Sequence, residues 1–273
     1  MQTPLEQARL AFLQGVEHFE AGRLAQARSS FEDSLGLAPG RPSVLGNLGV
    51  CLYALREWKQ AVQVLQQATA ADADNADAWI CLGLGQEHLG QWLLATQSLA
   101  RGLALRPDKA VHWLILGQCR RRVGDAKGAL AAFDQALERD ESLADAWSAR
   151  GSLMREIGEL QQAAMCFEKA LANGAEPTLH QYYLASVRGQ DSPSAPPRLY
   201  VESLFDDYAA DFQAHLVQAL HHRGHGQGRA EGRRVFVDDG RRRAELGEQP
   251  ERGDSHEAGV TQLSEGGNVG RQR

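Results

Sequence analysis

Small and large apolar residues recur along the first 177 residues with a period of 34. A glycine occupies the same place in five successive segments: Gly15, Gly49, Gly83, Gly117 and Gly151. An alanine follows twelve residues later in each segment, and a large apolar residue follows four residues after that: Phe31, Leu65, Leu99, Phe133 and Phe167. A fixed period of this length is typical of an array of repeated structural units. Each segment predicts two antiparallel helices, A and then B.

The residue types in these columns indicate how each helix pair packs. The small residues let the backbones of helices A and B approach closely, and we expect the large ones to fill the space between successive pairs. Glycines such as Gly22 and Gly90 fall at the predicted A-to-B turn. Trp58 and Trp92 share one position of their segments, so we expect them at the A–B corner. One pair cannot bury its faces alone, so stacked neighbours must build a continuous core.

Residues at further equivalent positions of the segments match the pattern of a known family. Trp79, Trp113 and Trp147 come four residues before their glycines, and Pro39 and Pro107 close their segments. The chain resembles the tetratricopeptide repeat family, whose pattern is W-x₂-L-G … A-x₃-F … P with a period of 34. The resemblance implies an all-α, right-handed superhelical solenoid of helix-turn-helix repeats. It covers five repeats, at residues 8–41, 42–75, 76–109, 110–143 and 144–177.

The chain continues beyond the repeats with a different organisation. Residues 178–189 predict one more helix of the A type, which would cap the array. Residues 190–198 form a linker rich in proline and serine. Apolar residues at three- and four-residue steps then predict an amphipathic helix over 199–221.

The last segment, residues 222–273, has the composition of a disordered tail. Its ten basic residues are all arginine, and from Arg223 onward only seven large apolar residues accompany eleven glycines. Such a composition cannot bury enough apolar surface to offset the entropy lost on ordering.

Residues 196–220 carry a second resemblance. They are similar to the helix that joins tetratricopeptide repeats to a class I S-adenosylmethionine-dependent methyltransferase domain in bacterial fusion proteins. The matching positions are Tyr200, Phe205, Asp206, Tyr208, Ala209, Phe212, His215 and Leu216. That family next has a strand that leads into a glycine-rich cofactor loop, D-x-G-x-G-x-G. Here the nearest candidate is VFVDDG at Val235–Gly240, which has one glycine.

The missing domain leaves two interpretations of the tail open. A frameshift in a GC-rich gene would replace the methyltransferase domain by an arginine- and glycine-rich sequence without lysine. The alternative is a natural disordered tail. About 50 residues remain after Leu220, which is too few for a doubly wound domain.

Charge and motif content narrow the function classes. The formal net charge of −6 argues against binding to nucleic acids or anionic membranes, which needs a basic field. No segment has the apolar length of a membrane helix, and the first residues lack a basic secretion-signal region. Phosphate loops and catalytic triads in a supporting context are absent from the sequence. We therefore expect a cytoplasmic protein without enzymatic activity, catalytic residues, cofactor or metal.

Two groups of side chains in the sequence have the chemistry of metal ligands. The four cysteines lie on separate predicted helices and are expected to be buried small apolar residues. The sequence His221-His222-x-x-His225 could bind a metal, but it lies where the last predicted helix meets the tail.

The resemblance places function in the groove lined by the A helices. In this family, positions 2, 5, 9, 12 and 13 line the concave face, which here gives an apolar part and a polar to basic part. A carboxylate clamp would need several Lys, Arg and Asn columns, of which only Asn47 is suggestive. Arg121, Arg122 and Arg155 could form one basic patch for an acidic partner, or could be neutralised within the array by Asp145 and Glu156. The candidate groove residues for a protein or peptide partner are Phe12, Asn47, Val50, Tyr53, Ile80, Leu84, Leu114, Gln118, Arg121, Arg122 and Arg155.

Overall fold

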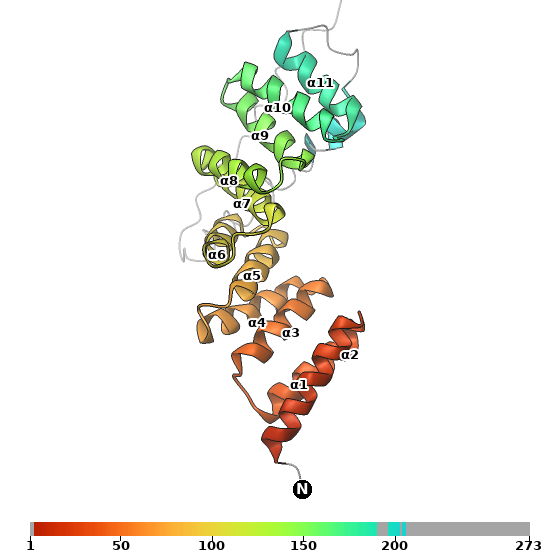
Figure 1. The fold of residues 1–273 in the computed structure, drawn as a ribbon, viewed down its shortest axis with the longest axis vertical. Helices are drawn as coiled ribbons and strands as arrows, with labels where there is room; N and C mark the ends of the chain where they lie inside the picture. Colours follow the sequence, from red (N-terminus) through yellow and green to blue (C-terminus); the bar gives the residue numbers. More distant parts are fainter. Residues whose placement is uncertain (1–2, 190–195, 203, 206–273) are drawn as a thin grey trace, which may run out of the picture. The chain divides into compact units, whose positions relative to one another are not determined.

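The computed structural model describes residues 3–189, 196–202 and 204–205 (Figure 1). All of them belong to one unit, Met1–Arg223. A second unit, Gly224–Arg273, lies outside the described residues, as does the tail predicted at 222–273. The helices are α1 (Pro4–Glu20), α2 (Leu24–Leu37), α3 (Pro42–Ala54), α4 (Trp58–Ala71), α5 (Ala76–His88), α6 (Trp92–Leu105), α7 (Ala110–Arg122), α8 (Ala126–Arg139), α9 (Ala144–Glu156), α10 (Leu160–Ala172) and α11 (Pro177–Arg188).

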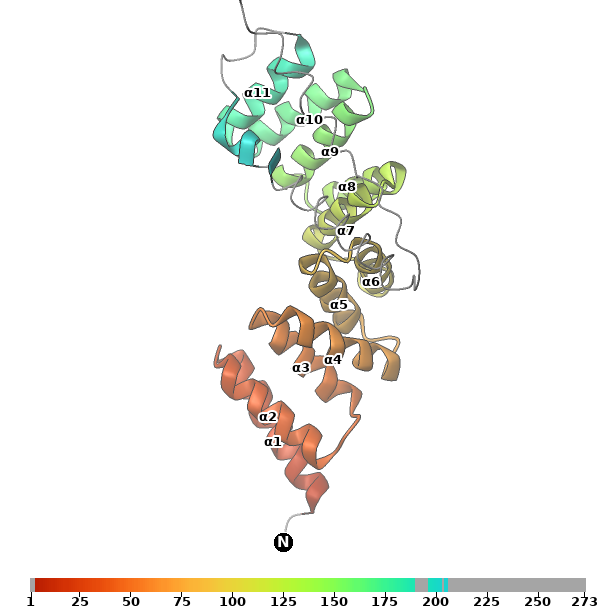
Figure 2. The same ribbon diagram turned by 180° about the vertical axis from the view of Figure 1, so that it is seen from behind.

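The helices pack as consecutive pairs, from α1 with α2 to α9 with α10, and each pair packs on the next (Figures 1 and 2). No β-strand occurs in the described part of the chain. The predicted all-α solenoid of helix-turn-helix repeats is therefore confirmed. The first helix begins at Pro4, four residues before the predicted first repeat, where Thr3 and Glu6 form a capping box.

The two layers of the stack differ in their contacts. From α1 to α9, each odd-numbered helix contacts the next odd-numbered one directly. Within the described residues, the even-numbered helices make no comparable contacts with one another. Since the odd-numbered helices approach each other more closely, they form one continuous surface, which we call the odd-helix face.

The repeated glycines hold the two helices of a pair together. A Cβ atom on Gly117 would lie 2.4 Å from Cε1 of Phe133, which is fully buried. The same relation joins Gly15 to Phe31 and Gly49 to Leu65. The large residue of helix B thus lies directly against the glycine of its own pair. The missing Cβ leaves the room that the large side chain occupies, and Phe133 belongs to the same core cluster as Ala146 and Leu153 of the next pair.

The corner tryptophans also join neighbouring pairs. The ring of Trp58 lies 5.0 Å from that of Tyr53 at the predicted A–B corner, and it stacks on His88 of the next pair at 4.2 Å. The ring of Trp92 lies 5.6 Å from the guanidinium of Arg122. His88 and Arg122 are 34 residues apart, so both tryptophans contact the same position of the following odd-numbered helix.

The turn inside the second pair contains a strained residue. Arg56 has φ +62°, in the left-handed region, at the place where the other four pairs have a glycine. A Cβ atom makes this conformation unfavourable by roughly 1–2 kcal/mol. The Arg56 side chain makes no hydrogen bond or ion pair with the described residues, so nothing at this position offsets the strain.

Replacing Arg56 by glycine is therefore expected to stabilise the protein by about 1 kcal/mol, because glycine adopts positive φ without steric cost. The measurement is the midpoint of urea unfolding followed by circular dichroism. The control is Arg56→Ala, which removes the same guanidinium but keeps the Cβ atom. An equal gain in both variants would show that the side chain, and not the backbone, is responsible.

The last described helices close the array at its C-terminal end. Tyr183 of α11 stacks on Phe167 with ring centroids 5.0 Å apart. After the linker, Tyr200 packs on Tyr182 at 4.9 Å and on Tyr183 at 6.1 Å. The start of the segment predicted as an amphipathic helix thus folds back onto α11. Its residues 206–221 lie outside the described part of the chain.

Candidate functional site

Five of the predicted groove residues retain accessible surface on the odd-helix face. The side chains of Phe12, Val50 and Tyr53 are partly buried, so each keeps part of its apolar surface in contact with solvent. Asn47 is also partly buried and donates a hydrogen bond to the carbonyl of Ser43. Gln118 of α7 is exposed.

Three predicted groove residues belong to the core instead. Ile80 is 4% exposed, Leu84 9% and Leu114 6%. A Cβ atom on Gly102 would lie 2.6 Å from Cγ1 of Ile80, so this isoleucine fills the room left by a glycine of α6. Their assignment as contact residues is corrected, because a partner could not reach them without unpacking the helices.

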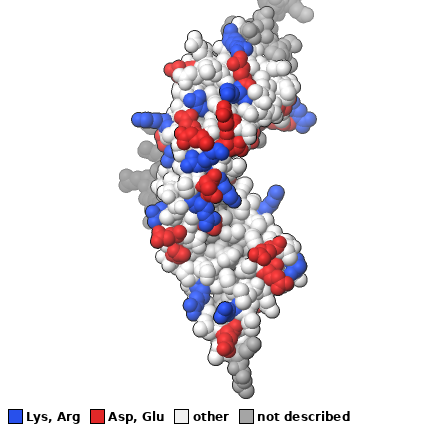
Figure 3. All heavy atoms as spheres, viewed as in Figure 1, with Lys and Arg blue, Asp and Glu red and all other residues white. Residues whose placement is uncertain are grey.

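The three predicted groove arginines have three different surroundings. Arg121 donates to Glu156 with 2.9 Å between Nη1 and Oε1. The guanidinium of Arg155 lies 4.9 Å from the ring centre of Tyr183, and that of Arg122 lies over Trp92. Figure 3 shows basic and acidic side chains next to one another on the face that it draws. The alternative of neutralisation within the array therefore holds for Arg121, while the common basic patch stays a prediction.

An aromatic cluster lies where α3, α4 and α5 meet. The hydroxyl of Tyr53 is 3.4 Å from Nε2 of His88, whose ring stacks on Trp58. Burial raises the pKa of the Tyr53 hydroxyl, with Cys81 and Glu87 adding to the effect. The hydroxyl is therefore a neutral hydrogen-bonding group at the edge of the odd-helix face.

A pocket of about 380 Å³ lies at the first helix pair, and we call it the N-terminal pocket. It opens between α1, the end of α2 and the start of α3. Its apolar lining includes the predicted groove residue Phe12, and two arginines border it. The lining residues are Leu5, Glu6, Ala8, Arg9, Phe12, Ser34, Ala38, Arg41, Ser43 and Val44.

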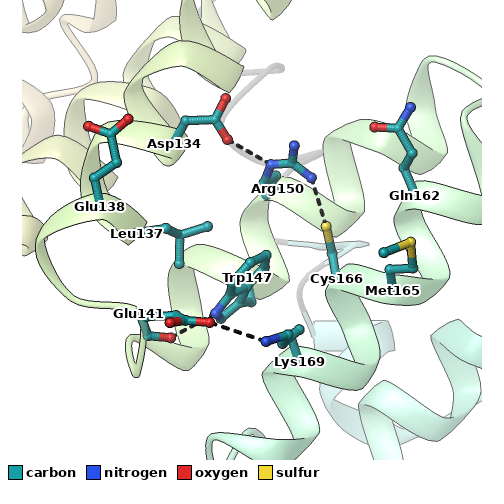
Figure 4. A pocket seen from close by; sticks show the side chains of 10 residues that line it. All are labelled: Asp134, Leu137, Glu138, Glu141, Trp147, Arg150, Gln162, Met165, Cys166 and Lys169. Atoms are coloured by element: carbon teal, nitrogen blue, oxygen red, sulfur yellow. Dashed lines mark hydrogen bonds and ion pairs between the residues drawn. The ribbon is translucent and has the colours of Figure 1, made fainter.

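A larger pocket of about 890 Å³ lies between α8, α9 and α10 (Figure 4). Its charged groups are already paired. Arg150 donates to Asp134 at 2.9 Å and to Sγ of Cys166 at 3.0 Å, and Lys169 donates to Glu141 at 3.1 Å. Burial raises the pKa of the Cys166 thiol, although Arg150 partly opposes the rise. The thiol is thus neutral, which disfavours a nucleophilic role.

The other cysteines are also poor nucleophiles. Burial raises the pKa of Cys81 to about 11 and that of Cys119 to about 12. Cys51, Cys119 and Cys166 are buried, as the sequence predicted, whereas Cys81 is only partly buried. Among the described residues, no group of His, Cys, Asp and Glu side chains is placed to hold a metal ion. The histidines at 221, 222 and 225 lie outside that part of the chain.

One buried polar pair has no signature along the sequence. His180 of α11 is 4% exposed, and its Nδ1 donates to the carbonyl of Glu176 at 2.8 Å. Its Nε2 lies 2.6 Å from Oγ of Ser148, whose hydroxyl donates to the carbonyl of Ala144 at 3.0 Å. Neither residue lines the N-terminal pocket or the pocket between α8 and α10. The pair joins α9 to α11 and lacks the adjoining substrate space that a Ser–His catalytic pair needs.

Within the described residues, none of the helices combines the length and apolar character needed to cross a bilayer.

Comparison with known proteins identifies the repeats. Two models of the tetratricopeptide repeat match residues 18–82, 82–144 and 116–178, which together span more than half of the chain. No curated protein matches the sequence significantly.

Solved structures show the same fold at low sequence identity. A crystal structure of MamA is 21% identical, with a TM-score of 0.58, and covers 62% of this chain and 92% of its own. MamA from Desulfovibrio magneticus RS-1 is 18% identical, with a TM-score of 0.57, and covers 62% and 95%. YrrB, a tetratricopeptide repeat protein described as having an unusual peptide-binding site, is 21% identical, with a TM-score of 0.59, and covers 63% and 88%.

Proposed function

Because this chain belongs to the tetratricopeptide repeat family, we propose that it is a non-catalytic, cytoplasmic scaffold that binds a segment of a partner protein along the odd-helix face. The fold supports a role in protein interaction, and the structurally similar YrrB has a peptide-binding site. A solenoid suits this role because its stacked repeats present a long, continuous surface.

One observation carries the choice of face. Phe12 lies on α1, and Val50 and Tyr53 lie on α3, the next odd-numbered helix. Each of these side chains is only partly buried. Covering such surface contributes roughly 25 cal/mol for each Å² removed from water. Aromatic side chains are also enriched among the residues that dominate binding energy at protein interfaces. The proposed contact residues are therefore the accessible uncharged members of the predicted set: Phe12, Asn47, Val50, Tyr53 and Gln118.

Site-specific photo-crosslinking tests this proposal. A benzophenone amino acid at Val50 or at Gln118 is expected to capture a protein partner in cells. The matched control places it at exposed Gln67 of α4, which lies on an even-numbered helix. Capture from Gln67 but not from the odd-helix positions would contradict the proposed face.

A second candidate function rests on the resemblance at residues 196–220 alone. In that case the protein is the repeat part of a methyltransferase whose catalytic domain was lost by a frameshift. Translating the other reading frames after the codon for Leu220 distinguishes the two. A D-x-G-x-G-x-G sequence in another frame would support the lost domain, whereas its absence would support a natural tail.

A further inference from the structure

The N-terminal pocket combines apolar lining residues with two arginines that have no ion-pair partner among the described residues. Arg9 of α1 and Arg41 before α3 both line it, and neither makes an ion pair or a side-chain hydrogen bond within the described residues. Arg121 and Arg155, farther along the odd-helix face, are engaged with Glu156 and Tyr183. Open positive charge thus lies at the first helix pair, at a place that the sequence did not indicate.

Glu6, the acidic residue that lines the pocket, also caps the N-terminus of α1. The carboxylate of Glu6 accepts a hydrogen bond from the backbone N–H of Thr3 at 2.7 Å, which lowers the pKa of Glu6 and completes the capping box of α1. The start of α3 adds to the positive field, because it has no side-chain cap and no acidic residue in its first turn. The pocket thus has two guanidiniums and one carboxylate in its lining, although the whole chain carries a net charge of −6.

The apolar part of the pocket is suited to a single side chain. Its apolar lining includes Phe12 together with Ala8 and Val44, both of which are buried. A volume of about 380 Å³ is at the lower end of the range for ligand pockets. One large apolar side chain can enter it, while the backbone of the partner continues along the odd-helix face.

We propose that the N-terminal pocket recognises an internal partner segment in which an apolar residue is flanked by acidic ones. The apolar side chain enters the pocket, and the two carboxylates pair with Arg9 and Arg41. Two guanidiniums on separate elements favour two carboxylates, whereas a chain terminus would bring only one next to its last side chain. This inference rests on the proposed function, because it defines the partner chemistry at one end of the same face.

The test uses the full-length chain and a fluorescent peptide that is acetylated and amidated and carries Glu-Phe-Asp among Gly and Ser. Fluorescence polarisation measures its affinity at low and high salt. In the double variant Arg9→Gln/Arg41→Gln, affinity is expected to fall at least about tenfold, and its salt dependence to shrink. The matched control is Arg56→Gln/Lys59→Gln, which removes two exposed cations that do not line the pocket and should leave the affinity unchanged.

Two further peptides make the proposal falsifiable. Equal binding of a Gln-Phe-Asn peptide would overturn the role of the carboxylates. Tighter binding of a peptide with a free terminal carboxylate and no acidic side chains would overturn the choice of an internal segment. If none of the peptides binds, the pocket proposal fails, while capture from Val50 would still support the odd-helix face. The melting temperature of the double variant should be unchanged, because both arginines are exposed and neither makes an ion pair or a side-chain hydrogen bond within the described residues.

Discussion

Replacing Gly117 by leucine should lower the free energy of unfolding by about 3 kcal/mol, at the upper end of the usual cost of overpacking a core. The first added atom alone would lie 2.4 Å from Cε1 and 2.5 Å from Cδ1 of Phe133. The Phe133 ring cannot move aside easily, because it is fully buried. The two helices cannot separate easily either, because α7 packs against α8 along its length. Urea unfolding followed by circular dichroism measures the loss.

The matched control for this variant is Gly36→Leu. Gly36 lies in α2, is exposed, has a negative φ, and has nothing within 4 Å of the place of its Cβ atom. Leucine is the better helix former, so this variant should be slightly more stable than the parent protein. Equal stability of the two variants would mean that the repeated glycines do not lie where the two helices of a pair approach closely.

Truncating Phe133 to alanine should cost about 3–5 kcal/mol, because it leaves a cavity between α7 and α8. Truncating Phe31, its equivalent in the first pair, removes the same atoms but should have a different effect. In a linear array each repeat contacts only its neighbours, so a terminal repeat can unfold while the others stay folded. Phe31→Ala should therefore loosen α1 and α2 alone, whereas Phe133→Ala weakens the pairs on both sides.

Hydrogen exchange with mass spectrometry distinguishes the two outcomes. Peptides from α1 and α2 should lose protection in Phe31→Ala, while those from α7 to α10 remain as in the parent protein. In Phe133→Ala the loss should spread across α5 to α10. Identical patterns in the two variants would show that the array unfolds as a single cooperative unit.

The fold could be predicted from the sequence because its packing is local and repeated. Gly117 and Phe133 are 16 residues apart, and the same spacing recurs in every pair, so the columns report directly on contacts within a pair. The side of the helix on which each residue lies follows from the same period. The alternation of large and small residues therefore carries most of the information about the solenoid.

The candidate site could be predicted only in part. The position of a residue in the repeat predicts the direction of its side chain but not how deeply the side chain is buried. Ile80 is buried because a glycine of α6 lies opposite. The pairing of Arg121 depends on Glu156, 35 residues away, and charges of this kind follow no fixed column. Arg9 and Arg41 were overlooked because a pocket at the junction of three helices has no signature along the chain.

The unequal contacts of the two helix layers have a mechanical consequence. Direct contacts join the odd-numbered helices from α1 to α9, whereas the even-numbered helices are connected mainly through their odd-numbered neighbours. Each junction between pairs should therefore behave as a hinge whose axis lies near the odd-numbered helices, and the even-numbered layer can open or close at little cost. A ligand that spans several junctions would restrict all these hinges together. Part of its binding energy would then be spent on stiffening the solenoid, so that a second ligand on the same array would bind to an already ordered scaffold.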